Sequence, residues 1–183
     1  MARIRTRWND RQRIRSPEEV ASALGVVIWK LAGDGVVTLE NEDFAVETYA
    51  QRLDVIAEFC AFQLHIVDRT LHTQRSDEER ELFVSALAKH LADTMQDNRS
   101  DAQDCGEYRK PFIALLNERS AAYAACSFSA ADGPSFVMGR NFGDNVAAVV
   151  GERNRKWIAD FVMAIQVPSI VSTLKRALPS LFE

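Results

Sequence analysis

Apolar residues recur at helical spacing along most of the chain, and the longest such pattern runs from about Asp43 to Gln74. At 100° per residue this stretch has two apolar faces, which predicts a helix covered by neighbours on both sides. One face carries Tyr49, Leu53, Ile56, Cys60, Leu64, Val67 and Leu71, and the other carries Phe44, Val55, Phe59, Phe62 and Ile66. Such a helix is typical of the middle of a bundle.

Helix start and stop signals divide the chain on both sides of this central stretch. Ser16-Pro17-Glu18-Glu19 is a capping box with proline at the first helical position, and it opens a first helix. We expect that helix to stop near Gly33 and Gly35, with residues 36–39 as a short extended connector. A second capping box begins at Ser76 and predicts a third helix that continues to about Gln96.

The remaining segments also read as helices separated by polar turns. Residues 97–107 are polar and turn-rich, which predicts a surface loop or hinge. Further helices are expected at about 110–131 and 135–150. The final segment, 154–178, alternates aromatic and aliphatic residues with polar ones, and we expect it to kink or break at Pro168.

These patterns predict an all-α protein. We expect an irregular or orthogonal bundle of six to seven helices around the long central helix at about residues 43–74. The chain of 183 residues has only eight glycines and five prolines, with little alternation typical of strands. Residues 16–183 are therefore predicted to form a single all-helical domain with one substantial core.

The first 15 residues differ from the rest in charge pattern. Their six arginines stand at odd positions, so an extended ribbon would place all of them on one face. They are Arg3, Arg5, Arg7, Arg11, Arg13 and Arg15. Because the total charge of −4 includes these arginines and Asp10, the remaining chain carries −9. We predict an extended basic arm that either lies across its own acidic body or binds nucleic acid or an anionic surface.

Membrane and redox signals are weak. The early apolar run from Val20 to Leu31 contains Lys30 and is shorter than the roughly 20 residues that cross a bilayer, so no transmembrane segment is predicted. The three cysteines are odd in number and form no CxxC pair or zinc-type spacing. We therefore expect a soluble protein in a reducing cytoplasm.

A polar seam separates the two apolar faces of the central helix. It consists of Gln51, Asp54, Glu58, His65, Asp68 and His72. One interpretation is a solvated side on which Asp68 and His72 form a weak pair one turn apart. A second is that the seam lines a groove, where Asp68 and Arg69 order a buried polar network or receive a peptide.

A third interpretation is a metal site. Carboxylates and imidazoles that project from the helices of a bundle can bind iron, zinc or manganese. The candidate ligands are His65, Asp68, His72 and, from the third helix, His90. Glu58 lies two turns from His65, about 10 Å along the axis, so these two cannot share one ion. His90 also shares a face with core residues, which favours an ordinary core histidine over a metal ligand.

Arg119 is a separate lead, because it shares a helix face with Phe112, Leu116 and Tyr123. It must either reach out to solvent or pair with a buried carboxylate of the polar seam. A pair of that kind favours a structural network over a metal site.

The chain contains no GxSxG, HExxH or phosphate-loop motif. We therefore expect a non-enzymatic binding or assembly protein without a cofactor, whose partner is another protein or a second copy of itself. The candidate binding residues are Glu58, His65, Asp68, Arg69 and His72. The alternative is a metal-dependent enzyme or redox protein built on the central helix.

Overall fold

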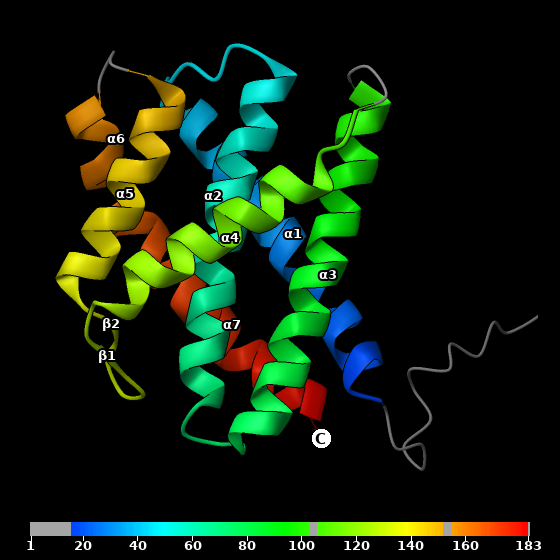
Figure 1. The fold of residues 1–183 in the computed structure, drawn as a ribbon. Coiled ribbons are helices and arrows are strands. Elements are labelled where there is room, and N and C mark those ends of the chain that lie inside the picture. Colours follow the sequence, from blue (N-terminus) through cyan, green and yellow to red (C-terminus); the bar gives the residue numbers. More distant parts are fainter. Residues whose placement is uncertain (1–15, 103–105, 152–154, 183) are drawn as a thin grey trace, which may run out of the picture.

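The computed structural model describes residues 16–102, 106–151 and 155–182, which are helical almost throughout (Figure 1). The elements are α1 (Pro17–Asn41), α2 (Tyr49–Leu71), α3 (Asp77–Ala102), α4 (Arg109–Ala124), β1 (Phe128–Ser129), β2 (Gly133–Pro134), α5 (Phe136–Val150), α6 (Arg155–Phe161), the π-helical turn η2 (Val162–Gln166) and α7 (Val167–Phe182). The predicted all-α bundle is confirmed. The predicted basic arm, residues 1–15, lies outside the described residues.

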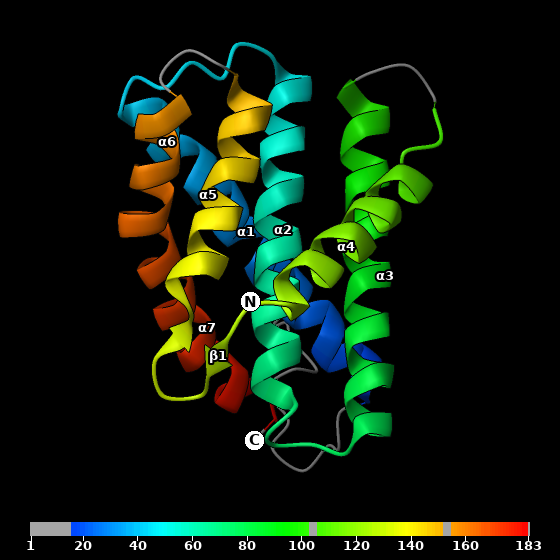
Figure 2. The same cartoon turned by 60° about the vertical axis from the view of Figure 1, so that its left-hand side comes forward.

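The central position predicted for the second helix is also confirmed. α2 is surrounded by α1, α3, α4, α5 and α7 (Figures 1 and 2). Every residue from Val55 to Val67 is buried. Phe59 and Phe62 both pack against Phe142 of α5, with ring centroids 5.0 and 4.2 Å apart. Because α2 is covered on its apolar faces, the middle of the polar seam, at Glu58 and His65, is buried as well.

The first helix does not stop at Gly33 and Gly35, so that prediction is wrong. α1 continues to Asn41 and includes residues 36–39, which were expected to be an extended connector. Gly35 faces the ring of Phe59 on α2, where an added Cβ would lie 2.9 Å from Cζ and closer still to Cε1. Glycine at this position allows two helices to approach each other, and it does not end the helix.

Two glycines of α1 provide a matched test of this close approach. Gly35→Ala is expected to lower the free energy of unfolding by about 1 to 3 kcal/mol, because the new methyl group overlaps the buried ring of Phe59. Gly33→Ala is expected to raise it by up to about 1 kcal/mol, because alanine has the higher helix propensity and its Cβ would meet no atom within 4 Å. Urea unfolding measures both changes. A Gly35→Ala variant as stable as Gly33→Ala would contradict the packing described here.

The central helix is shorter than predicted at both ends. Asp43, expected in its first turn, has a left-handed φ of 60° in the connection that follows α1. The cap of α2 is Thr48, whose Oγ1 accepts a hydrogen bond of 3.1 Å from the N–H of Gln51. Several residues could satisfy a helix start here, and the chain uses the one nearest the buried stretch.

The connection from α2 to α3 follows the prediction. The N–H of Ser76 donates to Glu79 Oε2 at 3.2 Å, and the N–H of Glu79 donates to Ser76 Oγ at 3.3 Å. α3 then extends past Gln96, so residues 97–102 of the predicted loop are helical. Gln96 holds the start of α4, because its Oε1 accepts from the N–H of Tyr108 at 2.7 Å.

The fourth and fifth helices meet at a small hairpin. α4 ends before the predicted limit at Ala131, because the chain turns into β1 and β2, with Gly133 at a φ of 85°. α5 covers the predicted fifth helix, and Ser135 caps it by accepting from the N–H of Met138 at 3.3 Å.

The helical segment does not break at Pro168, contrary to the prediction; a π-helical turn precedes this proline. η2 joins α6 and α7 into one continuous helical segment. Proline cannot donate a backbone hydrogen bond, and its ring crowds the carbonyl group four residues earlier. A turn in which the hydrogen bonds span five residues relieves this conflict locally, so the helix continues.

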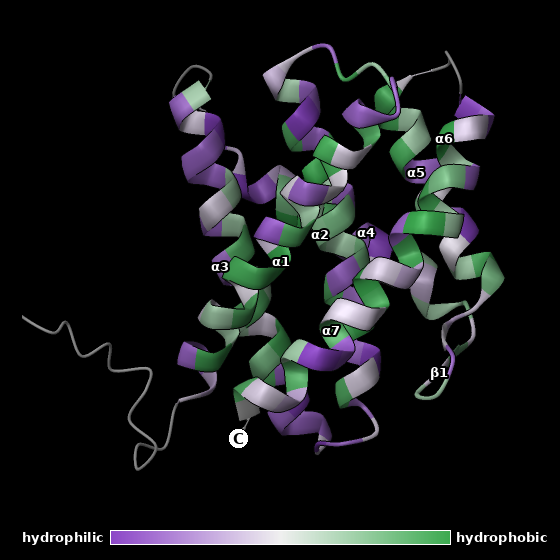
Figure 3. Ribbon diagram, turned by 180° about the vertical axis from the view of Figure 1, so that it is seen from behind, coloured by the Kyte–Doolittle hydropathy of each residue, from purple (hydrophilic) through white to green (hydrophobic). Residues whose placement is uncertain are grey.

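Two helical segments are long and apolar enough to cross a membrane by length and composition alone. They are Pro17–Asn41 and Arg155–Leu181, and 44% and 39% of their most apolar windows are buried inside the fold. Figure 3 shows hydrophobic stretches along both. The prediction based on the short run Val20–Leu31 therefore underestimated the length of the first helix. Core helices of soluble proteins pass the same test, so these features are weak evidence for a membrane span.

Candidate functional site

The carboxylates of the polar seam are each paired with an arginine from a neighbouring helix. The pairs are Asp54 with Arg99, Glu58 with Arg119, and Asp68 with Arg80. The carboxylate side chains differ in exposure, at 51%, 2% and 26% respectively. The seam is therefore neither a simple solvated face nor a cluster of free acids, and its most buried carboxylate is Glu58.

Glu58 and Arg119 form a two-pronged ion pair between α2 and α4. Arg119 Nε donates to Oε2 and Nη2 donates to Oε1, both at 2.8 Å. Arg119 Nη1 also donates to Glu118 at 2.5 Å. The hydrogen bonds to Glu58 raise the pKa of the Arg119 guanidinium, so this side chain stays charged. Of the two alternatives that the sequence leaves open for Arg119, the structure shows the pairing with a buried carboxylate of the seam.

His65 is buried, with 3% of its surface exposed, and lies in an apolar setting next to Tyr123 of α4. The two ring centroids are 5.6 Å apart. Its Nε2 atom has no hydrogen-bond partner among the described residues. Burial lowers the pKa of His65 to about 4. The nearby charge of Asp68 raises this pKa, and the charge of Arg69 lowers it. His65 is therefore neutral near pH 7.

Tyr123 is also enclosed. Its hydroxyl accepts a hydrogen bond of 3.2 Å from Asn145 Nδ2 on α5. Burial raises the pKa of Tyr123, so the hydroxyl stays protonated. Burial likewise raises the pKa of the Cys60 thiol on α2, which makes it an inert packing group.

The structure does not bring the proposed metal ligands together. The four candidates were His65, Asp68, His72 and His90. His72 is exposed, with Nδ1 3.8 Å from Asp77. His90 lies on α3 against Gly25 of α1, where an added Cβ would strike its ring. Among the described residues, no group of three or more His, Cys, Asp or Glu side chains is close enough to hold a metal ion. The alternative of an iron, zinc or manganese site on α2 has no support in this geometry.

Arg69, another predicted binding residue, has a local contact. Its guanidinium carbon lies 5.9 Å from the centre of the Phe128 ring in the hairpin. Arg69 and His72 thus lie at the C-terminal end of α2.

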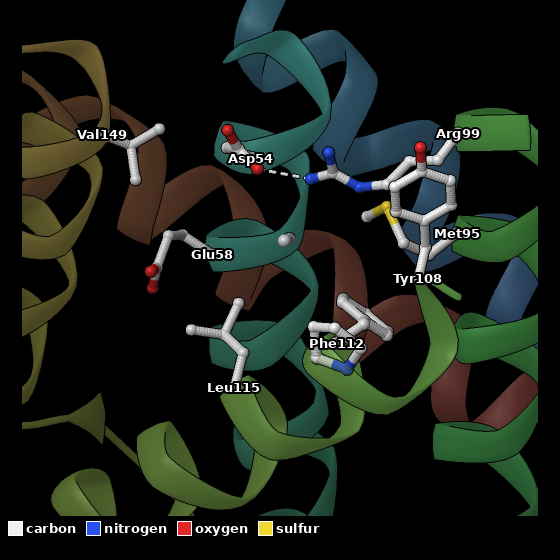
Figure 4. A pocket seen from close by; sticks show the side chains of 10 residues that line it. Asp54, Glu58, Met95, Arg99, Tyr108, Phe112, Leu115 and Val149 are labelled. Carbon is white, nitrogen blue, oxygen red and sulfur yellow. Dashed lines mark hydrogen bonds and ion pairs between the residues drawn. The ribbon is translucent and has the colours of Figure 1, made fainter. Parts of the chain in front are cut away.

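A pocket of about 460 Å³ opens beside the N-terminal half of α2, between α3, α4 and the end of α5 (Figure 4). It is lined by Asp54, Ala57, Glu58, Met95, Arg99, Tyr108, Pro111, Phe112, Leu115 and Val149. Most of this lining is apolar or aromatic. Such a surface suits an apolar group of a ligand, with a few charged atoms to fix its orientation.

Two ion pairs border the pocket. Asp54 accepts a hydrogen bond from Arg99, whose guanidinium carbon lies 5.7 Å from the centre of the Tyr108 ring. Figure 4 shows Glu58 directed toward the side of Val149 and Leu115, away from Arg99. The charged groups therefore stand at two separate edges, with apolar side chains between them.

Of the predicted binding residues, only Glu58 lines the pocket; Asp54 belongs to the same predicted seam. The contributions of Met95, Arg99, Tyr108 and Val149 were missed. The sequence predicts a polar loop over residues 97–107, whereas Arg99 is helical and its side chain is 15% exposed. The four-residue spacing of Met95 and Arg99 was the available signal, since it places both on one helix face.

No protein-family model, curated protein or solved structure matches this chain.

Proposed function

We propose that this protein is a non-enzymatic binding protein that recognises a segment of another protein in the pocket beside α2. The observation that carries this proposal is the pocket itself, which has an apolar centre and charged edges held by two ion pairs. A volume of about 460 Å³ is large enough to take one or two side chains of a partner and lies in the range of ordinary ligand pockets.

The composition of the lining supports a protein partner. Tyrosine, phenylalanine, methionine and arginine are enriched at protein interfaces, and Tyr108, Phe112, Met95 and Arg99 lie together here. Aromatic residues and arginine also dominate the positions where interface mutations have large effects. Pro111 is exposed beside them, so the pocket continues onto a surface that a partner can cover.

The same lining gives little support to catalysis. None of the described residues around the pocket is a histidine, cysteine, serine or threonine. A general base works best with a pKa near the operating pH and a clear approach to the substrate. Both carboxylates of the pocket are instead hydrogen-bonded to arginines.

Filling the pocket tests the proposal. Peptides that bind the full chain are first selected from a displayed random library. Calorimetry then compares how tightly the selected peptides bind the unmodified chain and two tryptophan variants. Leu115→Trp narrows the pocket, and we expect it to weaken binding of the selected peptides about tenfold or more, a loss of about 1.4 kcal/mol. Ala114→Trp is the matched control, because Ala114 is exposed on the same helix and does not line the pocket.

The control variant should bind as tightly as the unmodified chain. If Leu115→Trp bound every selected peptide as well as Ala114→Trp does, recognition through this pocket would be ruled out. Failure to select any peptide would count equally against the proposal.

A further inference from the structure

The pocket already contains a cation of the protein's own. The guanidinium of Arg99 lies between the carboxylate of Asp54 and the ring of Tyr108 (Figure 4). A carboxylate on one side and an aromatic ring on the other are the two groups that bind guanidinium and ammonium ions in proteins. The side chain of Arg99 is only 15% exposed, so it is folded into the pocket wall.

Asp54 is the half of this arrangement that can accept a second cation. Its side chain remains 51% exposed, and among the described residues only its Oδ1 atom has a hydrogen-bond partner. An ionised carboxylate has about four acceptor positions, so Asp54 can accept further donors from a ligand. Because the carboxylate of the pair is half exposed, the pair contributes little to stability, and a cation of the ligand can compete with Arg99 for Asp54.

Glu58, the second carboxylate of the lining, is already balanced by its own arginine. It lies one turn from Asp54 on α2, and it cannot turn away because it is 2% exposed and held by two bonds from Arg119. Asp54 is therefore the carboxylate of the described lining that is open to a cation of a ligand. The net charge of −4 on the whole chain also favours a cation over an anion.

We infer that the partner segment carries a basic side chain, an arginine or a lysine flanked by apolar residues, and that this cation replaces Arg99 as the partner of Asp54. In the free protein, Arg99 thus occupies the position beside Asp54 that the partner's basic side chain takes in the complex. The apolar neighbours of the partner's basic residue contact the surface formed by Phe112, Leu115 and Val149. This inference rests on the proposed function and specifies which segments the pocket selects.

Three synthetic peptides test the charge requirement. All are acetylated and amidated and have leucines on both sides of a central position, which is arginine, citrulline or glutamate. Citrulline has nearly the shape of arginine without its charge. Calorimetry on the full chain is expected to show the arginine peptide binding about tenfold or more tightly than the citrulline peptide, as for a charge-assisted hydrogen bond. The glutamate peptide should bind most weakly.

Two variants test the role of Arg99. Arg99→Met removes the competing cation and should tighten binding of the arginine peptide about tenfold, with little change for citrulline. Asp54→Asn should remove the preference for arginine over citrulline. Arg52→Met is the matched control, because Arg52 pairs with Glu40 at 3.3 Å and does not line the pocket. Circular dichroism verifies that each variant is folded, and the peptide comparison on the unmodified chain does not depend on any variant.

The outcomes separate this inference from the proposed function. Equal binding of the arginine and citrulline peptides, with both weakened by Leu115→Trp, would overturn the charge requirement and leave the binding pocket intact. Tightest binding of the glutamate peptide would also overturn it. If no peptide bound and the selection on the displayed library also failed, both the inference and the proposed function would fall.

Discussion

Replacing Arg119 with methionine is expected to lower the free energy of unfolding by about 3 to 5 kcal/mol, because Glu58 would remain buried without its partner. The carboxylate is 2% exposed and accepts both of its hydrogen bonds from this arginine. Methionine has a similar length and an apolar character, so the variant keeps most of the packing while removing the charge. Urea unfolding followed by circular dichroism measures the loss.

The double variant Glu58→Met with Arg119→Met is the control for this prediction. Removing both charges leaves no buried ion, so its stability should lie within about 1 kcal/mol of the unmodified chain or above it. If the single and double variants were equally unstable, the loss would come from packing alone. A single variant as stable as the unmodified chain would show that Glu58 needs no partner.

The stability of the protein is expected to fall as the pH decreases from 6.5 toward 4, and His65 should account for part of that fall. The pKa of this histidine is about 4 in the folded chain and near 6.5 when it is unfolded. The unfolded chain therefore takes up a proton first, and the stabilising contribution is complete only above the unfolded value. Allowing for screening by solvent, the contribution is about 2 to 3 kcal/mol.

The variant His65→Leu tests the contribution of His65 to the pH dependence of stability, and His72→Leu is its control. Urea midpoints of His65→Leu should change less with pH across this interval than those of the unmodified chain. The exposed His72 should make no such difference when replaced. If the unmodified chain and His65→Leu showed the same pH dependence, proton uptake by His65 would not contribute.

The sequence was most informative about the buried centre of the fold. The two apolar faces between residues 49 and 71 required neighbours on both sides, and the structure provides them. Capping boxes at Ser16 and Ser76 also identified helix starts correctly, because a cap depends on residues within one turn. Predictions failed where a distant contact decided the outcome. Gly35 looks like a stop signal locally, whereas in the fold it makes room for the ring of Phe59 within a continuing helix.

The candidate site was predicted in part for a similar reason. Periodicity placed Asp54, Glu58, His65 and Asp68 on one seam, and it gave pairing with a buried carboxylate as one of two alternatives for Arg119. It did not reveal that the seam has different neighbours along its length. The part near Asp54 borders a pocket, whereas His65 is enclosed against Tyr123. Those differences depend on how α3 and α4 cross α2, which a linear pattern does not contain.

The π-helical turn before Pro168 has a consequence for how the last helix meets the first. Buried residues here recur every four positions, at Val162, Gln166, Ile170, Leu174 and Leu178. In a regular α-helix, positions four apart rotate by about 40° at each step, so this row would wind away from the core. The wide turn absorbs part of that rotation, as one added residue would. It thereby keeps this row of side chains directed toward the core. Gln166 Nε2 can then donate a hydrogen bond of 3.3 Å to the carbonyl oxygen of Gly35, which links the last helical segment to α1.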